Sequence, residues 1–75
     1  MAAHKLTRAD KQRRVIVSAR TFKGLTQEKI AKRLGISVSA YSYIERDIGR
    51  ADFSRVAQIC KMLNVDLSTL AEIEE

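Results

Sequence analysis

The 75-residue sequence has no proline or tryptophan, three glycines and one cysteine, and each scarcity limits what the chain can build. One cysteine forms no internal disulfide, and one cysteine with one histidine cannot supply the four ligands of a structural zinc site. The longest aliphatic run covers only residues 15 to 17, too short for a signal-peptide core or a membrane span. We therefore expect a cytoplasmic protein with a purely hydrophobic core and no metal, cofactor or small-molecule ligand.

Charge is distributed unevenly along the chain, which carries 14 Lys and Arg against 9 Asp and Glu. The net charge is +6 over residues 1–24, +2 over residues 25–50 and −3 over residues 51–75. A polyanion would approach the first two thirds of such a chain and avoid the last third. Nucleic acid is therefore the first candidate partner, although the charge pattern alone fits ordinary solvated helix faces equally well.

Apolar residues recur at helical rather than alternating spacing, which predicts an all-α fold. The expected helix N-caps are Thr7, Thr26, Asp52 and Asp66, with a third helix beginning after Ser37, and the expected left-handed ends are Gly24, Gly35 and Asn64. These signals indicate five helices. They divide the chain into a basic arm over residues 1–6 and a single domain over residues 7–75, with a loop at residues 47–51.

The helical periods also predict the core. The side chains expected to face inward or to lie beside the inward stripe are Val15, Ile16, Ala19, Phe22, Ile30, Ala31, Leu34, Ala40, Tyr41, Ile44, Phe53, Val56, Ala57, Ile59, Cys60, Leu63, Leu67, Leu70 and Ile73.

Residues 24–47 carry the most informative pattern, two short helices joined by a tight turn. We expect Ala31 and Gly35 to be small because a larger side chain would block a steep crossing of the two helices. This spacing is typical of a helix-turn-helix, here over residues 26–46. In that motif the second helix enters the major groove while the first braces it across the DNA backbone.

The same stretch resembles the Cro/CI-type helix-turn-helix family, which includes lambda-type phage repressors and xenobiotic-response-element regulators. The family's Gly-Leu-Thr-Gln-Glu is matched at residues 24–28, its Ala at 31, its Leu-Gly-Ile-Ser at 34–37 and its Ile-Glu-Arg at 44–46. The resemblance continues to Leu70 and implies a five-helix, lambda repressor-like domain. Two positions depart from it. Asp47 replaces a glycine, so the turn must differ or Asp47 must be left-handed, and Tyr41 replaces an aliphatic residue and needs a hydroxyl partner.

The resemblance implies roles for four groups of residues. The expected base-reading residues are Ser37, Val38, Ser39, Ser42 and Tyr43. The expected phosphate-binding residues are Lys5, Arg8, Thr26, Gln27, Lys32, Arg46 and Arg50, with Gln27 also bracing the next helix. Arg20 and Glu45 are expected to form a structural ion pair, and Met62, Leu67, Leu70 and Ile73 to form a dimer surface.

Together these features predict a sequence-specific regulator of transcription, a repressor or autoregulatory controller. It would bind a palindromic operator in double-stranded DNA as a homodimer and lie with the nucleoid in the cytoplasm. The sequence shows no Gly-rich phosphate loop, nucleophile and histidine pair or metal-ligand cluster that would indicate an enzyme. Two alternatives with the same fold stay open: a protein-interaction adaptor, and an RNA-bound or ribosome-associated bridging factor.

Overall fold

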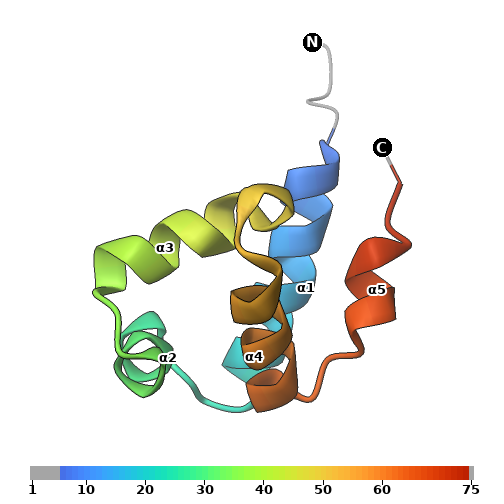
Figure 1. Ribbon diagram of the computed structural model, residues 1–75. Coiled ribbons are helices and arrows are strands. Elements are labelled where there is room, and N and C mark those ends of the chain that lie inside the picture. Colours follow the sequence, from blue (N-terminus) through green and yellow to red (C-terminus); the bar gives the residue numbers. More distant parts are fainter. Residues whose placement is uncertain (1–5, 75) are drawn as a thin grey trace, which may run out of the picture.

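The computed structural model describes residues 6–74, and within that part of the chain all regular structure is helical. The elements in order are α1 (Arg8–Phe22), α2 (Gln27–Leu34), α3 (Val38–Arg46), the short 3₁₀ turn η1 (Ile48–Arg50), α4 (Phe53–Leu63) and α5 (Leu67–Ala71). Figure 1 shows α2 and α3 on the left and α5 on the right, with α1 and α4 between them. The predicted all-α fold with five helices is confirmed. No helix within residues 6–74 has the length and apolar character needed to cross a membrane.

Each α-helix starts at a residue whose side chain accepts a hydrogen bond from a backbone N–H of the first turn. These N-caps are Thr7, Thr26, Ser37, Asp52 and Asp66. At Thr7 the cap is reciprocal, because its own N–H donates to the Asp10 carboxylate at 3.1 Å. This satisfies backbone groups that a helix leaves unpaired at its start. The N-caps predicted from the sequence are all confirmed, as are the left-handed residues Gly24, Gly35 and Asn64.

The core is formed by side chains of α1, α2, α3, η1 and α4, and α5 adds Leu70 to it. Its buried apolar side chains are Ile16, Ile30, Ala31, Tyr41, Ile48, Val56, Ile59, Cys60, Leu63 and Leu70. Leu34, Ile36 and Ile44 are half-buried and pack against this core, which joins α2 and α3 to the rest of the domain. Burial also raises the pKa of the Cys60 thiol, which keeps it in the unreactive protonated form at neutral pH.

Three residues predicted to face or flank the core are exposed instead. Ala40 lies about 100° around α3 from Tyr41, outside the arc that Tyr41 and Glu45 bury. Phe22 is at the last position of α1, six residues and therefore about 240° from Ile16. Phe53 opens α4 at the edge of its buried arc, and its side chain is 70% exposed. In each case the apolar period gave the helix correctly but not the width of the face that neighbouring helices cover.

The two turns around α3 differ from their predicted forms. A Cβ atom added to Gly35 would meet no atom within 4 Å, so crowding does not require glycine there. The φ angle of +72° at Gly35 does require glycine, because residues with a Cβ atom disfavour that conformation. Asp47 is not left-handed, with φ −145° and ψ 75°, so the turn itself differs from the family's form. The predicted loop also contains η1, which buries Ile48 in the core.

Candidate nucleic-acid interface

The turn between α2 and α3 is held by backbone hydrogen bonds and by the cap of α3. The Ile36 N–H donates to the Ala31 carbonyl at 3.0 Å, and the Gly35 N–H donates to the Lys32 carbonyl at 3.1 Å. The Ser37 hydroxyl then accepts from the Ala40 N–H at 3.0 Å, so only two residues separate Gly35 from α3. This local geometry places α3 at the side of the molecule (Figure 1). Tyr41 and Glu45 are buried on one of its faces, and the opposite face is exposed.

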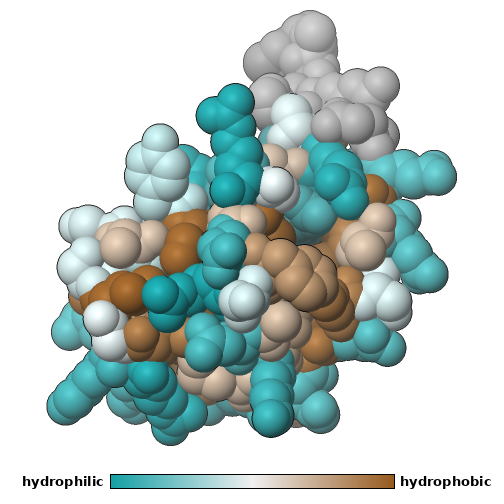
Figure 2. All heavy atoms as spheres, in the orientation of Figure 1, coloured by the Kyte–Doolittle hydropathy of each residue, from teal (hydrophilic) through white to brown (hydrophobic). Residues whose placement is uncertain are grey.

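The open face of α3 carries the residues predicted to read bases. Val38 is 41% and Tyr43 is 72% exposed, Ser37 and Ser39 are also exposed, and Ser42 is half-buried. Tyr43 follows Ser39 by one helical turn, which places both side chains on the same outward stripe. Figure 2 shows mainly pale and brown side chains over the left end of α3, whereas strongly hydrophilic side chains line the lower edge of the same view. From Ser37 to Tyr43 the outward face of α3 is therefore uncharged, and the first charge on it is Arg46 at the end of the helix.

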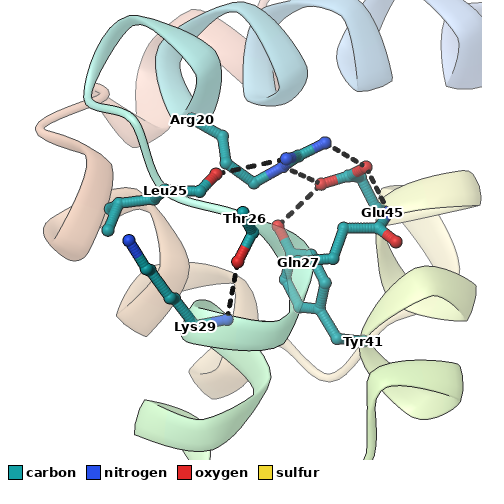
Figure 3. Close-up of polar contacts among 7 residues, drawn as sticks. All are labelled: Arg20, Leu25, Thr26, Gln27, Lys29, Tyr41 and Glu45. Atoms are coloured by element: carbon teal, nitrogen blue, oxygen red, sulfur yellow. Dashed lines mark hydrogen bonds and ion pairs between the residues drawn. The ribbon is translucent and has the colours of Figure 1, made fainter.

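The packed face of α3 ends in a buried carboxylate, Glu45, which is 4% exposed and accepts four hydrogen bonds. Arg20 donates from Nε to Oε2 at 2.9 Å and from Nη2 to Oε1 at 3.3 Å. Gln27 Nε2 donates to Oε1 at 2.9 Å, and the Tyr41 hydroxyl donates to Oε2 at 2.8 Å. Figure 3 shows these four residues, which we call the Glu45 cluster, converging from α1, α2 and α3. The expected pair between Arg20 and Glu45 is thus present, within a larger network.

The Glu45 cluster determines how α3 is oriented. Arg20 also donates from Nη1 to the Leu25 carbonyl at 3.2 Å, so one guanidinium fixes both the chain entering α2 and the end of α3. A paired, two-point contact between guanidinium and carboxylate fixes direction as well as distance. Tyr41 finds in Glu45 the hydroxyl partner that its position required. Burial, with the hydrogen bond to and the charge of Glu45, raises the pKa of Tyr41 far above its usual value.

The residues predicted to bind phosphates occupy different environments. Lys32, Arg46 and Arg50 are exposed, and Arg50 Nε lies 3.8 Å from an Asp47 carboxylate oxygen. Thr26 is exposed at the start of α2, where its oxygen accepts from the Lys29 N–H at 3.1 Å. Gln27 is half-buried with its amide directed at Glu45. Four of these five residues thus expose their side chains near α2 and α3.

Two further predicted phosphate contacts fall outside this group. Lys5 lies outside the described residues. Arg8 is used differently: its Nε donates to the Ile73 carbonyl at 2.7 Å and its Nη2 to the Ala71 carbonyl at 3.1 Å. The guanidinium therefore binds the carbonyl end of α5, where unpaired C=O groups attract a cation. We remove Arg8 from the predicted phosphate-binding set.

The predicted dimer surface also needs a correction. Leu70 is 2% exposed and belongs to the core of one chain, so it offers almost no area to a partner, although it lies at the floor of the hollow described below. Met62, Leu67 and Ile73 are half-buried. Beside Leu67 lies an open hollow of about 500 Å³. It is lined mostly by apolar side chains, among them Ile48, Ala51, Phe53, Val56, Leu67 and Ala71.

Sequence reasoning missed two polar contacts that hold the helices bearing the site. Gln12 is buried in α1 and donates from Nε2 to the Leu70 carbonyl at 3.1 Å. Arg55 in α4 donates from Nη1 to the Leu34 carbonyl at 3.1 Å, at the C-terminal end of α2. Both acceptors are backbone groups, so no pair of residue types in the sequence indicates either contact.

Comparison with known proteins agrees with this geometry. The helix-turn-helix family model HTH_3 matches residues 16–70, most of the chain. The matched range extends from Ile16 in the core of α1 to Leu70 in α5, and it includes the whole Glu45 cluster and the open face of α3. A search of curated proteins and a search of solved structures each found no match.

Proposed function

Because this chain belongs to the HTH_3 helix-turn-helix family and is a DNA-binding regulator of that kind, we propose that it is a repressor or autoregulatory controller of transcription. It binds a two-fold symmetric operator as a homodimer, with α3 in the major groove. The observation that carries the proposal is the arrangement of α3. Its outward face is uncharged over residues 38–43 and is flanked by the exposed cations Lys32, Arg46 and Arg50, and the Glu45 cluster fixes its orientation.

Different residues on and around α3 provide the affinity for DNA and the selection of sequence. Lys32, Arg46 and Arg50 bind phosphates, which position a protein on the duplex without carrying sequence information. Thr26 and Gln27 add contacts at the start of α2, where the helix dipole and free N–H groups favour an anion. Gln27 Nε2 has two hydrogens, and the one not directed at Glu45 donates to phosphate. Glu45 therefore orients Gln27 for that contact.

Dimerisation supplies the specificity that a single α3 lacks. One recognition helix covers only a few base pairs, whereas two helices held one turn of DNA apart, roughly 34 Å, recognise two half-sites together. We place the dimer contact at the apolar hollow beside Leu67. Phe53 projects at its rim, so one surface offers both an apolar knob and an apolar depression. A two-fold interface requires such self-complementarity.

Salt dependence of binding to duplex DNA tests the DNA contact. We expect the logarithm of the association constant to fall with the logarithm of salt concentration by about 0.9 per phosphate contact. Fluorescence anisotropy with a labelled duplex at several salt concentrations measures this slope. A flat salt response, or no binding at low salt, would refute DNA binding. Stronger competition by structured RNA than by duplex DNA would favour the bridging-factor alternative.

Light scattering across protein concentration tests the dimer. We expect Phe53→Ser to shift the protein toward the monomer and to weaken binding to a two-half-site operator. Phe22→Ser is the matched control, because Phe22 is also an exposed phenylalanine, 92% exposed against 70% for Phe53, but does not line the hollow. A protein that stays monomeric at all concentrations and binds a single half-site with full affinity would contradict the homodimer.

A further inference from the structure

Up to Tyr43, the open face of α3 lacks every side chain that forms paired hydrogen bonds with base edges, and Arg46 at its end is assigned to phosphate. Residues 37–44 contain no Arg, Lys, Asn, Gln, Asp or Glu. Arg and Lys recognise guanine in the major groove, Asn and Gln recognise adenine, and Asp and Glu accept from cytosine. Direct readout by this segment must therefore rely on hydroxyl groups and apolar groups.

The hydroxyl groups on this face offer little discrimination. Ser37 already uses its oxygen to accept from the Ala40 N–H at 3.0 Å, and Ser42 is half-buried. Ser39 is exposed, but a serine hydroxyl both donates and accepts and so tolerates several bases. Hydrogen bonds from these serines can add affinity for a DNA half-site but cannot specify its base sequence.

This face also exposes apolar side chains close together. Val38 is 41% exposed and Tyr43 is 72% exposed, and Ala40 also faces solvent. If a helix with such a surface enters the major groove, burying its apolar side chains against an apolar group there is favourable. The C5-methyl group of thymine is the apolar group that the major groove displays.

We propose that Val38 and Tyr43 recognise thymine methyl groups, so that the half-site is rich in A·T pairs where α3 contacts it. The inference rests on the proposed function, because it requires α3 to lie in the major groove. Val38 is the first residue of α3, at the end that points most directly toward base edges in helix-turn-helix proteins. Tyr43 presents an aromatic ring edge to a second methyl group, farther along the groove.

Replacement of thymine by deoxyuridine tests this directly. The first step is selection of a bound duplex from a random DNA pool, followed by synthesis of the same duplex with deoxyuridine in place of the half-site thymines. Deoxyuridine keeps every hydrogen-bonding group and loses only the methyl group. We expect affinity to fall about fourfold for each contacted methyl, the effect of one buried methyl-sized group. Anisotropy titration of both duplexes at one salt concentration measures the ratio.

A methyl group placed on cytosine provides the complementary test. Exchange of one contacted T·A pair for C·G should weaken binding. The same C·G pair with 5-methylcytosine should recover part of the loss, because its methyl group occupies the same place in the major groove. Recovery on methylation cannot be explained by hydrogen bonds, since 5-methylcytosine and cytosine donate and accept alike.

Three variants assign the effect to its residues. Val38→Ala and Tyr43→Ala should each reduce the ratio between the thymine and deoxyuridine duplexes. Tyr43→Phe should preserve it if the ring makes the contact. Lys32→Ala is the control, because loss of a phosphate contact should weaken both duplexes equally and leave the ratio unchanged.

The outcomes separate this inference from the proposed function. Equal affinity for the thymine and deoxyuridine duplexes, with binding still dependent on salt, overturns methyl recognition and leaves DNA binding intact. A selected half-site with only G·C pairs at the contacted positions overturns it as well. Failure of both duplexes to bind at low salt removes the proposed function itself.

Discussion

The two ends of α1 are held by different kinds of polar contact. At its C-terminal end, Arg20 joins the Glu45 cluster, in which every partner is a side chain: one carboxylate receives four hydrogen bonds from three other residues. None of these bonds survives an exchange of Glu45 for an apolar residue. This end of α1 therefore depends on particular residue types at particular positions.

At the N-terminal end of α1, three side chains donate to backbone carbonyls of α5 and of the residues that follow it. Arg8 donates to Ile73 and Ala71, Lys11 Nζ donates to the Glu74 carbonyl at 2.9 Å, and buried Gln12 donates to Leu70. We call these the α5 carbonyl contacts. A carbonyl is present whatever residue carries it, and it has room for more than one donor. This end of the molecule should therefore tolerate substitution better than the Glu45 cluster, although both ends bury polar atoms.

Removal of the central carboxylate should have the largest effect. Glu45→Ala leaves Arg20, whose side chain is 15% exposed, without its ion-pair partner and strands the Tyr41 hydroxyl in the core. Breaking a buried ion pair by removing one partner costs about 3–5 kcal/mol of unfolding free energy. Urea unfolding followed by circular dichroism measures the loss. Glu28→Ala, on the exposed side of α2, should change stability by no more than about 0.5 kcal/mol. A loss below about 1 kcal/mol for Glu45→Ala would show that the cluster does not hold α3.

Tyr41→Phe should have the next largest effect. At neutral pH the loss of one hydrogen bond to a charged group costs about 1.5–3 kcal/mol. Because burial, helped by Glu45, raises the pKa of Tyr41 in the folded protein above its usual 10.0, the unfolded chain loses this proton first. The stabilisation from Tyr41 is therefore complete below pH 10 and declines as the pH rises above it. We expect the difference in unfolding free energy between wild type and Tyr41→Phe to become smaller above that pH.

Unfolding by urea at a series of pH values from neutral to alkaline measures this gap. Tyr43→Phe is the control, since Tyr43 has the same chemistry on the exposed face of α3 and should leave stability unchanged throughout. A gap between wild type and Tyr41→Phe that widens in alkali would contradict the assigned direction of the pKa shift.

Gln12→Leu should lower the unfolding free energy less, and it tests whether the N-terminal end of α1 tolerates substitution. The Leu70 carbonyl that Gln12 contacts also accepts from the Ile73 N–H at 3.3 Å, so the substitution leaves it with a partner. The expected loss is about 0.5–1.5 kcal/mol, the net value of one ordinary hydrogen bond. Urea unfolding under the same conditions gives the comparison. A loss as large as that of Glu45→Ala would end the distinction between the two regions.

The same contrast explains what the sequence could predict. Helix starts and ends follow from one or two neighbouring residues, as at Thr26 and Gly35, so local chemistry was sufficient. The pair of Arg20 and Glu45 was expected because its two residue types match a family pattern. The additional donor Gln27 required the packing of α2 against α3, which brings its amide within reach of the carboxylate. Tyr41 lies one turn before Glu45 on α3, so the sequence spacing alone allowed its contact.

The features that sequence reasoning missed depend on packing between distant segments. Arg8 carries a charge that suited a phosphate, and only the position of α5 beside α1 shows that it binds carbonyls instead. The exposure of Phe53 and the burial of Ile48 depend in the same way on which neighbours cover them. Apolar periodicity identifies a helix face, but the width of the covered arc is a property of the assembled fold.

Arg8 and Arg46 provide the finest comparison, because both are arginines and both were candidates for phosphate contact. Arg8→Ala should lower the unfolding free energy by about 0.5–1 kcal/mol, because the hydrogen bonds that it removes are partly exposed and screened by solvent. The same substitution should leave the salt slope of DNA binding unchanged. Arg46→Ala, at an exposed position ending α3, should do the reverse: stability within about 0.5 kcal/mol and a salt slope smaller by about 0.9. Urea unfolding and anisotropy at several salt concentrations, applied to both variants, measure the two quantities. If Arg8→Ala instead reduces the slope as Arg46→Ala does, the end of α1 contacts DNA, and the division between a recognition end and a structural end fails.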